Sequence, residues 1–294
     1  MKKQARNYIR RIGLLILLEL CAFHLLLAQN LAVSPQEVSF QSNDYKIHGW
    51  FYQAKGYAPF PVVILLQGFP GKDGDLFELG QNLSKEGFNA LSFNYSGTWK
   101  SEGIFLPETS LKSVQAAIDF LKSEQAVKTY SIDTSQIVLI GYSYGGGIAL
   151  LASLYQHSLN KIISIAGGDL GVIAEMIEEN PDFRKAHCEM LDHYMSDSTI
   201  ARGSGGQTSH DWLLKNRDFY DLKKCAGKLA GKEILLIGGW LDHTIMLEDH
   251  ILPLYRSLQE SGATEVEIQV FETDHSFKNV RSELTAKIFS WLKK

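Results

Sequence analysis

Alternation between two periodicities constrains the fold of this chain more than any other feature of its sequence. From Val38 onward, apolar runs of strand length alternate with stretches in which apolar residues recur at helical spacing. This alternation predicts a mainly parallel sheet with right-handed crossovers and helices on both faces. We expect an α/β fold whose first two strands form an antiparallel hairpin at one edge. The predicted strands span residues 38–40, 47–52, 61–67, 88–93, 136–141, 161–166, 233–237 and 265–271.

One stretch interrupts the alternation. Residues 170–216 are polar and irregular, and Arg202-Gly-Ser-Gly-Gly206 is typical of a loop. No repeat of solenoid length accompanies it. We therefore expect a single domain over residues 29–294, with residues 170–216 as an inserted cap.

The first 28 residues differ from the rest. Five basic residues precede an apolar run over residues 12–28, and the chain turns polar at Gln29. This order is typical of a secretory signal peptide, here cleaved near Ala28, which predicts a secreted or periplasmic protein. A retained membrane anchor is the alternative, although a spanning helix needs about 20 apolar residues and this shorter run contains Glu19. Lipid attachment at Cys21 is a third possibility.

Charge and cysteine content narrow the possible partners. Removal of residues 1–28 takes away five basic residues and one acidic residue, which moves the formal net charge from −4 to −8. A chain with a net negative charge does not attract the negatively charged phosphate backbone, so we expect no nucleic-acid partner. Cys188 and Cys225 remain after cleavage, and the sequence leaves open whether they pair.

A candidate nucleophile lies between a predicted strand and a predicted helix. Gly141-Tyr-Ser-Tyr-Gly145 follows the strand at 136–141 and opens a helical stretch rich in small residues. Such a turn holds its serine in a strained conformation, and the two glycines let strand and helix approach without a Cβ clash. The helix N-terminus also favours developing negative charge. We therefore predict Ser143 as the nucleophile.

With this motif in place, the chain from Val38 to Trp291 resembles the α/β-hydrolase superfamily. It is most similar to the branch that contains dienelactone hydrolases and the catalytic domains of prolyl-oligopeptidase-like serine peptidases. The resemblance implies an α/β-hydrolase fold and hydrolysis, while the substrate does not follow from the fold. Besides the opening hairpin and two late segments, the matching features are Leu66-Gln-Gly-Phe-Pro-Gly71, Asn94-Tyr-Ser-Gly97, Ser101-Glu-Gly103 and the turn at Ser143.

The resemblance implies a catalytic triad in the chain order serine, acid, histidine. The serine needs a base to remove its proton, and the base needs a carboxylate to hold its tautomer. His275 follows the last predicted strand and is the predicted base. Asp242 follows the strand at 233–237, where the family has its acid, and Asp169, one strand earlier, is the alternative. Asp274 is too close to His275 along the chain to orient its ring well.

The resemblance also implies an oxyanion hole made of two main-chain amides. The predicted donors are Tyr144, directly after the nucleophile, and Phe69, in the loop after the strand at 61–67. Family members usually have His-Gly where this chain has Gln67-Gly68, which leaves open how the loop is braced. Trp240 is predicted to flank the nucleophile as a substrate-binding residue.

The predicted chemistry requires neither a cofactor nor a metal. A polar cluster in the inserted segment could suggest metal ligands, but its spacing matches no ligand pair on one helical face, so we expect no metal there. The cluster consists of His187, Cys188, Asp192 and His193.

These features favour an exported serine hydrolase that cleaves an ester, or less readily an amide, of a small acyl substrate through an acyl-enzyme on Ser143. One alternative is a prolyl-oligopeptidase-like peptidase. Such peptidases usually carry an N-terminal propeller, whereas only about ten residues separate the predicted cleavage site from the first strand. A second alternative is a non-catalytic binding protein on the same scaffold. Proteins of that kind typically lack a triad member, and all three are present here.

Overall fold

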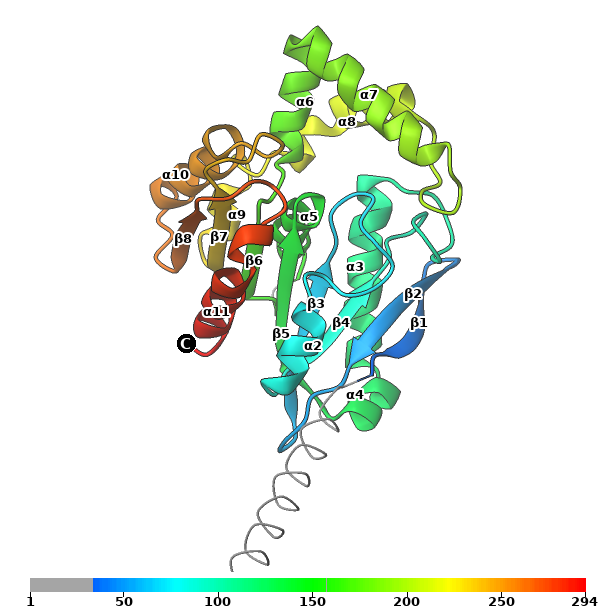
Figure 1. The fold of residues 1–294 in the computed structure, drawn as a ribbon, viewed down its shortest axis with the longest axis vertical. Coiled ribbons are helices and arrows are strands. Elements are labelled where there is room, and N and C mark those ends of the chain that lie inside the picture. The colour runs from blue at the N-terminus through cyan, green and yellow to red at the C-terminus, as the bar shows by residue number, and fades with distance from the viewer. Residues whose placement is uncertain (1–33, 157) are drawn as a thin grey trace, which may run out of the picture. The chain divides into compact units, whose positions relative to one another are not determined.

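The computed structural model describes residues 34–156 and 158–294, so the predicted signal segment lies outside the described residues. The described chain contains an eight-stranded sheet of order β1-β2-β4-β3-β5-β6-β7-β8 (Figure 1). The pairs β1–β2 and β2–β4 are antiparallel, and all other neighbours are parallel, which confirms the predicted α/β fold with its antiparallel hairpin. The strands are β1 (Gln36–Ser42), β2 (Tyr45–Tyr52), β3 (Phe60–Leu66), β4 (Asn89–Phe93), β5 (Ile132–Tyr142), β6 (Lys161–Ile165), β7 (Glu233–Gly239) and β8 (Val266–Phe271).

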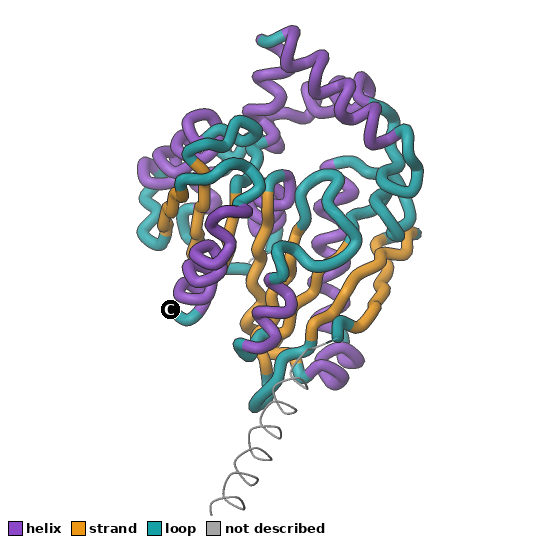
Figure 2. Tube along the Cα trace, viewed as in Figure 1, coloured by secondary structure: helices purple, strands orange, loops and turns teal. Residues whose placement is uncertain are grey.

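Helices cover both faces of the sheet (Figures 1 and 2). Along β3, Val62 and Ile64 belong to one hydrophobic core and Val63 and Leu65 to the other, and all four are fully buried. Burial on both faces explains why this strand is a continuous apolar run. The first core also contains residues of α3, α5 and α10, and the second contains residues of α2 and α11. These and the remaining elements are α2 (Leu79–Lys85), α3 (Pro107–Lys122), α4 (Glu124–Tyr130), α5 (Tyr144–Ser153), α9 (Ala226–Leu229), η1 (Leu247–Ile251), α10 (Leu252–Glu260), η2 (Lys278–Val280) and α11 (Arg281–Leu292).

The segment between β6 and α9 is helical, so the prediction that it is irregular was wrong. In α7 (Pro181–Met195) the apolar residues form no clear stripe, since this helix buries Leu191 alone, whereas α6 (Leu170–Glu179) buries an apolar face. The sequence nevertheless contains a signal for the start of α7, namely Asn180 followed by Pro181. In the structure the Asn180 side chain accepts hydrogen bonds from two amides of the first turn. Residues 170–220, called the insertion below, contain α6 (Leu170–Glu179), α7 (Pro181–Met195) and α8 (Gly206–Tyr220).

The insertion lies at the carboxyl ends of the parallel strands, with α7 running across that edge (Figure 1). A ring contact joins it to the loop after β3, because the rings of Tyr194 and Phe69 meet edge to face at 5.8 Å. Within residues 34–156 and 158–294, no helix combines the length and the apolar character that a membrane span requires.

Candidate active site

Ser143 occupies a strained turn between β5 and α5. Its backbone has φ 56° and ψ −123°, a conformation that non-glycine residues rarely adopt. Strain of this kind costs about 1–3 kcal/mol and clusters at functional sites. Hydrogen bonds hold the turn, because the Ser143 amide donates to the Ile165 carbonyl over 2.8 Å and the Ser143 carbonyl accepts from the Gly168 amide over 3.0 Å. The turn is therefore fixed by β6 and by the residues that follow it.

The glycines on either side of Ser143 are required by close backbone contacts. A Cβ on Gly141 would lie 2.0 Å from the Gly145 carbonyl oxygen, and a Cβ on Gly145 would lie 2.3 Å from that of Leu66. Neither approach is sterically possible, and the atoms in the way belong to backbone that cannot easily move. The spacing of the motif thus follows from how tightly β5, α5 and β3 meet.

Three polar side chains form a hydrogen-bonded line at the carboxyl ends of the strands. His275 Nε2 lies 3.0 Å from Ser143 Oγ, and His275 Nδ1 lies 2.7 Å from Asp242 Oδ2. Because an ionised carboxylate can only accept, the Nδ1 proton faces Asp242, and Nε2 is left free to accept the serine proton. The three residues come from separate loops, after β5, β7 and β8.

The environment of Asp242 keeps this residue ionised. Its side chain is buried, and burial alone would raise its pKa. Hydrogen bonds from the His275 ring and from the amides of Ile245 and Thr244 outweigh burial and lower the pKa below its ordinary value. Those amides donate to Oδ1 over 2.9 and 2.8 Å, which leaves Oδ2 for the histidine. The carboxylate is therefore both charged and fixed in orientation.

Tyr142 is a further residue of this site, and sequence reasoning missed it. Its hydroxyl donates a 2.8 Å hydrogen bond to the His275 carbonyl, and the two rings lie 5.0 Å apart. Burial and the nearby Asp242 charge raise the pKa of Tyr142 to about 12, so the hydroxyl stays protonated and able to donate. Its place next to Ser143 was the available signal, but the contact depends on the position of the loop after β8.

The alternative acids have other partners. Asp169 caps α6, with its Oδ1 accepting from the Gly171 and Leu222 amides over 2.8 and 3.2 Å. Burial raises the pKa of Asp169 to about 6, the opposite of the shift at Asp242. Asp274 Oδ1 accepts from the amide and the hydroxyl of Ser276, in a local turn. The residue that the structure brings to the His275 ring is Asp242.

Two main-chain amides close to the turn at Ser143 have no protein acceptor within the described residues. Tyr144 is the first residue of α5, and within the described chain neither its amide nor that of Phe69 donates to a protein acceptor. The loop that contains Phe69 passes close to Ser143, since a Cβ on Gly68 would lie 3.2 Å from the serine Cβ. Unpaired amides at a helix N-terminus favour an anion. The two amides are therefore available to an anion, as the predicted oxyanion hole requires.

The side chain of Gln67 braces the loop after β3, here called the oxyanion loop (residues 67–78). Gln67 Nε2 donates to the Gly74 carbonyl over 3.0 Å and lies 3.3 Å from Ser92 Oγ, which itself donates to Gly74 over 2.7 Å. The Tyr95 hydroxyl donates to the Gln67 carbonyl over 3.2 Å. A glutamine therefore closes the loop on itself at the position where relatives usually have histidine.

The other predicted residues form no hydrogen bond with this line within the described chain. Trp240 follows β7 with 58% of its surface exposed, and its amide donates to the Phe271 carbonyl. Cys188 and Cys225 are both free thiols. His187 Nδ1 lies 2.8 Å from His210 Nε2, and no group of three or more possible ligands is arranged to hold a metal in the described part of the chain.

Comparisons with known proteins identify the family of this chain. The family model for the alpha/beta hydrolase fold matches residues 61–237. A 140-residue stretch is 27% identical to quorum-quenching protein AidA of Acinetobacter baumannii (strain MDR-ZJ06), covering 46% of this chain and 44% of that protein. The chain covers half or less of the length of the curated relatives it matches.

Solved structures resemble the chain over nearly all of its length. An esterase of Pyrococcus furiosus, Pf2001, superposes with a TM-score of 0.65 at 16% identity, covering 90% of this chain and 92% of the esterase. The acylaminoacyl peptidase of Pyrococcus horikoshii superposes with a TM-score of 0.64 at 18% identity, covering 90% of this chain and 41% of the peptidase. At these identities the likeness shows the fold.

Proposed function

This chain belongs to the α/β-hydrolase family, and from that premise we propose that it is a serine hydrolase that cleaves carboxylic esters through an acyl-enzyme on Ser143. The observation that carries the proposal is the hydrogen-bonded line from Asp242 through His275 to Ser143, with distances of 2.7 and 3.0 Å. These are the contacts that a serine nucleophile needs for activation.

In the first step, His275 Nε2 takes the proton from Ser143 Oγ while the oxygen attacks the carbonyl carbon of the ester. The imidazolium that forms is stabilised by the Asp242 carboxylate, which keeps its charge because its pKa is lowered. The new C–O bond turns the carbonyl oxygen into an oxyanion. The Phe69 and Tyr144 amides, which have no protein acceptor within the described chain, are the proposed donors to it.

The tetrahedral intermediate then collapses and releases the alcohol. The bond to the leaving oxygen breaks, and His275 gives its proton to that oxygen, which leaves an ester on Ser143. Water enters, His275 removes its proton, and the same sequence in reverse frees the carboxylic acid and restores the serine hydroxyl. In each half of the cycle His275 takes one proton during the attack and gives it back during the collapse, so the protons balance without a cofactor.

The insertion is proposed to act as a cap that sets substrate preference. Phe69 carries a proposed oxyanion donor, and its ring lies between Phe105, at 4.4 Å, and Tyr194 of α7, at 5.8 Å. An acyl chain entering beside the Phe69 amide would therefore meet aromatic surface. Apolar surroundings favour small or medium acyl groups without charge. Trp240, exposed beyond β7, is a second proposed contact with substrate.

We expect small activated esters to be better substrates than peptides. p-Nitrophenyl acetate and butyrate should be hydrolysed readily, because the proposed triad and oxyanion hole suffice for a good leaving group. Dipeptidyl-anilides should be cleaved poorly, because the site proposed here from the described residues includes no carboxylate that would bind the free amino end of a peptide. Initial rates measured on both classes at equal enzyme concentration provide the test.

A matched pair of variants separates this preference from general damage. Tyr194→Ala, which removes the ring next to Phe69, should shift the ratio of butyrate to acetate hydrolysis. Phe289→Ala, in α11 on the second core, should leave the ratio unchanged. Efficient anilide release with ester hydrolysis at background would instead favour the peptidase alternative.

We further propose that the chain is exported and that residues 1–28 are removed. The basic start, the apolar run and the polar residues from Gln29 support this. Protein recovered from its native host should have an intact mass that corresponds to a start near Gln29. A full-length product in the membrane fraction would contradict cleavage, and a lipid adduct on Cys21 would identify the third processing route.

A further inference from the structure

The loop between β4 and α3 connects the insertion to the oxyanion loop. We call residues 97–105 the bridging loop. On one side it pairs with the insertion like a short antiparallel ladder: the Trp99 amide donates to Ile200 over 2.9 Å, and the Arg202 amide donates to Gly97 over 2.7 Å. Thr98 and Ala201 form the isolated bridge between these bonds. The segment of the insertion between α7 and α8 is thus hydrogen-bonded to the bridging loop through its main chain.

The side chain of Arg202 strengthens this attachment. Its guanidinium donates to the carbonyls of Trp99 over 3.2 Å and of Ser198 over 2.6 Å, and also to that of Ser101. Trp99 itself has φ 47°, in the left-handed region that bulky residues avoid. Such a conformation persists only where the surroundings hold it from several sides. Here the insertion binds both the amide and the carbonyl of Trp99.

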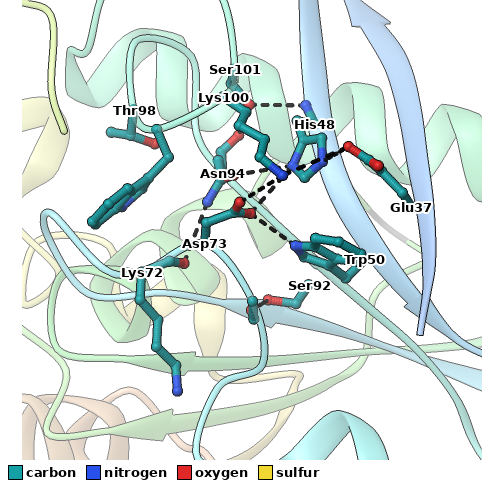
Figure 3. Close-up of polar contacts among 12 residues, drawn as sticks. Glu37, His48, Trp50, Lys72, Asp73, Ser92, Asn94, Thr98, Lys100 and Ser101 are labelled. Atoms are coloured by element: carbon teal, nitrogen blue, oxygen red, sulfur yellow. Dashed lines mark hydrogen bonds and ion pairs between the residues drawn. The ribbon is translucent and has the colours of Figure 1, made fainter. Parts of the chain in front are cut away.

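On its other side, the bridging loop holds the oxyanion loop through two consecutive residues. The Trp99 indole N–H donates to the Pro70 carbonyl over 2.9 Å, one residue beyond Phe69. Lys100 Nζ lies 3.1 Å from Asp73 Oδ2. Asp73 is the centre of a polar cluster (Figure 3), where its Oδ1 accepts from the Trp50 indole over 2.8 Å.

Further contacts make this cluster a fixed anchor on the sheet. His48 Nδ1 lies 3.4 Å from Asp73 Oδ1, and its Nε2 lies 2.5 Å from Glu37 Oε1. His48 and Trp50 both come from β2 (Figure 3). Asp73 is therefore fixed to the sheet, whereas the part of the oxyanion loop around Pro70 is held by Trp99.

We propose that Trp99 is a positioning residue through which the docked insertion holds the Phe69 amide in place for reaction. The inference rests on the proposed function, because it assigns Phe69 as an oxyanion donor. An oxyanion donor acts only when it lies about 2.7–3.1 Å from the oxygen in the transition state, so a small shift of the loop reduces the rate. Ground-state binding of the ester does not depend on this donor to the same degree. Movement of the insertion away from the bridging loop would thus lower turnover rather than substrate affinity.

The test uses Trp99→Phe, which keeps an aromatic ring and removes the indole N–H that Pro70 accepts. For p-nitrophenyl butyrate we expect kcat to fall roughly 10- to 100-fold, the range for a misplaced catalytic group, with KM changed about twofold or less. The inhibition constant of an alkyl boronic acid, which mimics the tetrahedral intermediate, should rise by the same factor as kcat/KM falls. Arg202→Ala should act in the same direction. The double variant should lose less than the product of the two single effects, because both act through one connection.

Trp291→Phe in α11 is the matched control, since it makes the same substitution at a tryptophan that is buried in the second core, whereas Trp99 is partly buried. It should lower the melting temperature without changing the boronate constant. A folded Trp99→Phe variant with unchanged kcat would overturn the inference, as would a loss of kcat that Trp291→Phe reproduces. An active wild type in either case leaves the proposed function intact. A wild type that neither hydrolyses esters nor reacts with a fluorophosphonate would refute the proposed function itself, and the inference with it.

Discussion

Ser143→Ala is expected to abolish covalent labelling by a fluorophosphonate and to lower kcat for p-nitrophenyl butyrate by roughly 10⁶-fold, as loss of the nucleophile does in serine proteases. The physical reason is that Ser143 Oγ is the hydroxyl that contacts the His275 ring among the described residues, 3.0 Å from Nε2. The rate that remains should be that of a site that keeps the proposed oxyanion donors but lacks a nucleophile. Intact-mass analysis after labelling gives the stoichiometry directly.

Ser153→Ala is the matched control for this variant. Ser153 is a buried serine at the end of α5, and its hydroxyl donates to the Leu150 carbonyl. Its replacement should leave labelling and kcat close to those of the wild type. Equal labelling of Ser143→Ala and the wild type would remove Ser143 as the nucleophile. A wild type that stays unlabelled while folded would favour the non-catalytic binding protein.

The second large effect concerns the carboxylate. Asp242→Asn should lower kcat by about 10⁴-fold, the size seen when the acid of a serine-protease triad is made neutral. An amide group would donate its N–H to His275 Nδ1 and so move the ring proton to Nε2. Nε2 would then face Ser143 with a proton already bound and could not accept another. Substrate KM should change little, because the shape of the site is retained.

Asp169→Asn distinguishes this role from a general effect of a buried carboxylate. Asp169 accepts hydrogen bonds from two amides, and an asparagine oxygen can accept both. The kcat of the Asp169→Asn variant, measured in the same assay, should therefore stay within a few-fold of the wild-type value. A ranking in which Asp169→Asn is the more damaging change would move the acid one strand earlier, to the alternative that the sequence leaves open.

Features that depend on residues close together along the chain could be predicted from the sequence. The apolar run of β3 predicts a strand buried on both faces because burial allows no polar alternation. The motif around Ser143 predicts a strained turn because two glycines at that spacing serve a close approach of strand and helix. The structure contains this approach, since a Cβ on Gly141 or on Gly145 would lie 2.0 or 2.3 Å from a backbone oxygen. The fold and the family that followed from these patterns are confirmed. The catalytic roles of Ser143, Asp242 and His275 stay predictions, although the structure brings the three side chains together.

Contacts between residues far apart along the chain became visible with the folded structure. Asp169 and Asp242 both follow parallel strands, and β6 lies nearer to β5 than β7 does, yet the Asp169 carboxylate is occupied in capping α6. In the insertion, α7 was missed because it buries Leu191 alone, so the periodicity that marks a helix is weak there. The brace at Gln67, the Tyr142 bond to His275 and the link through Trp99 join loops far apart in the chain. Their partners are chosen by the order of the strands and the path of each loop, which no local pattern of residues encodes.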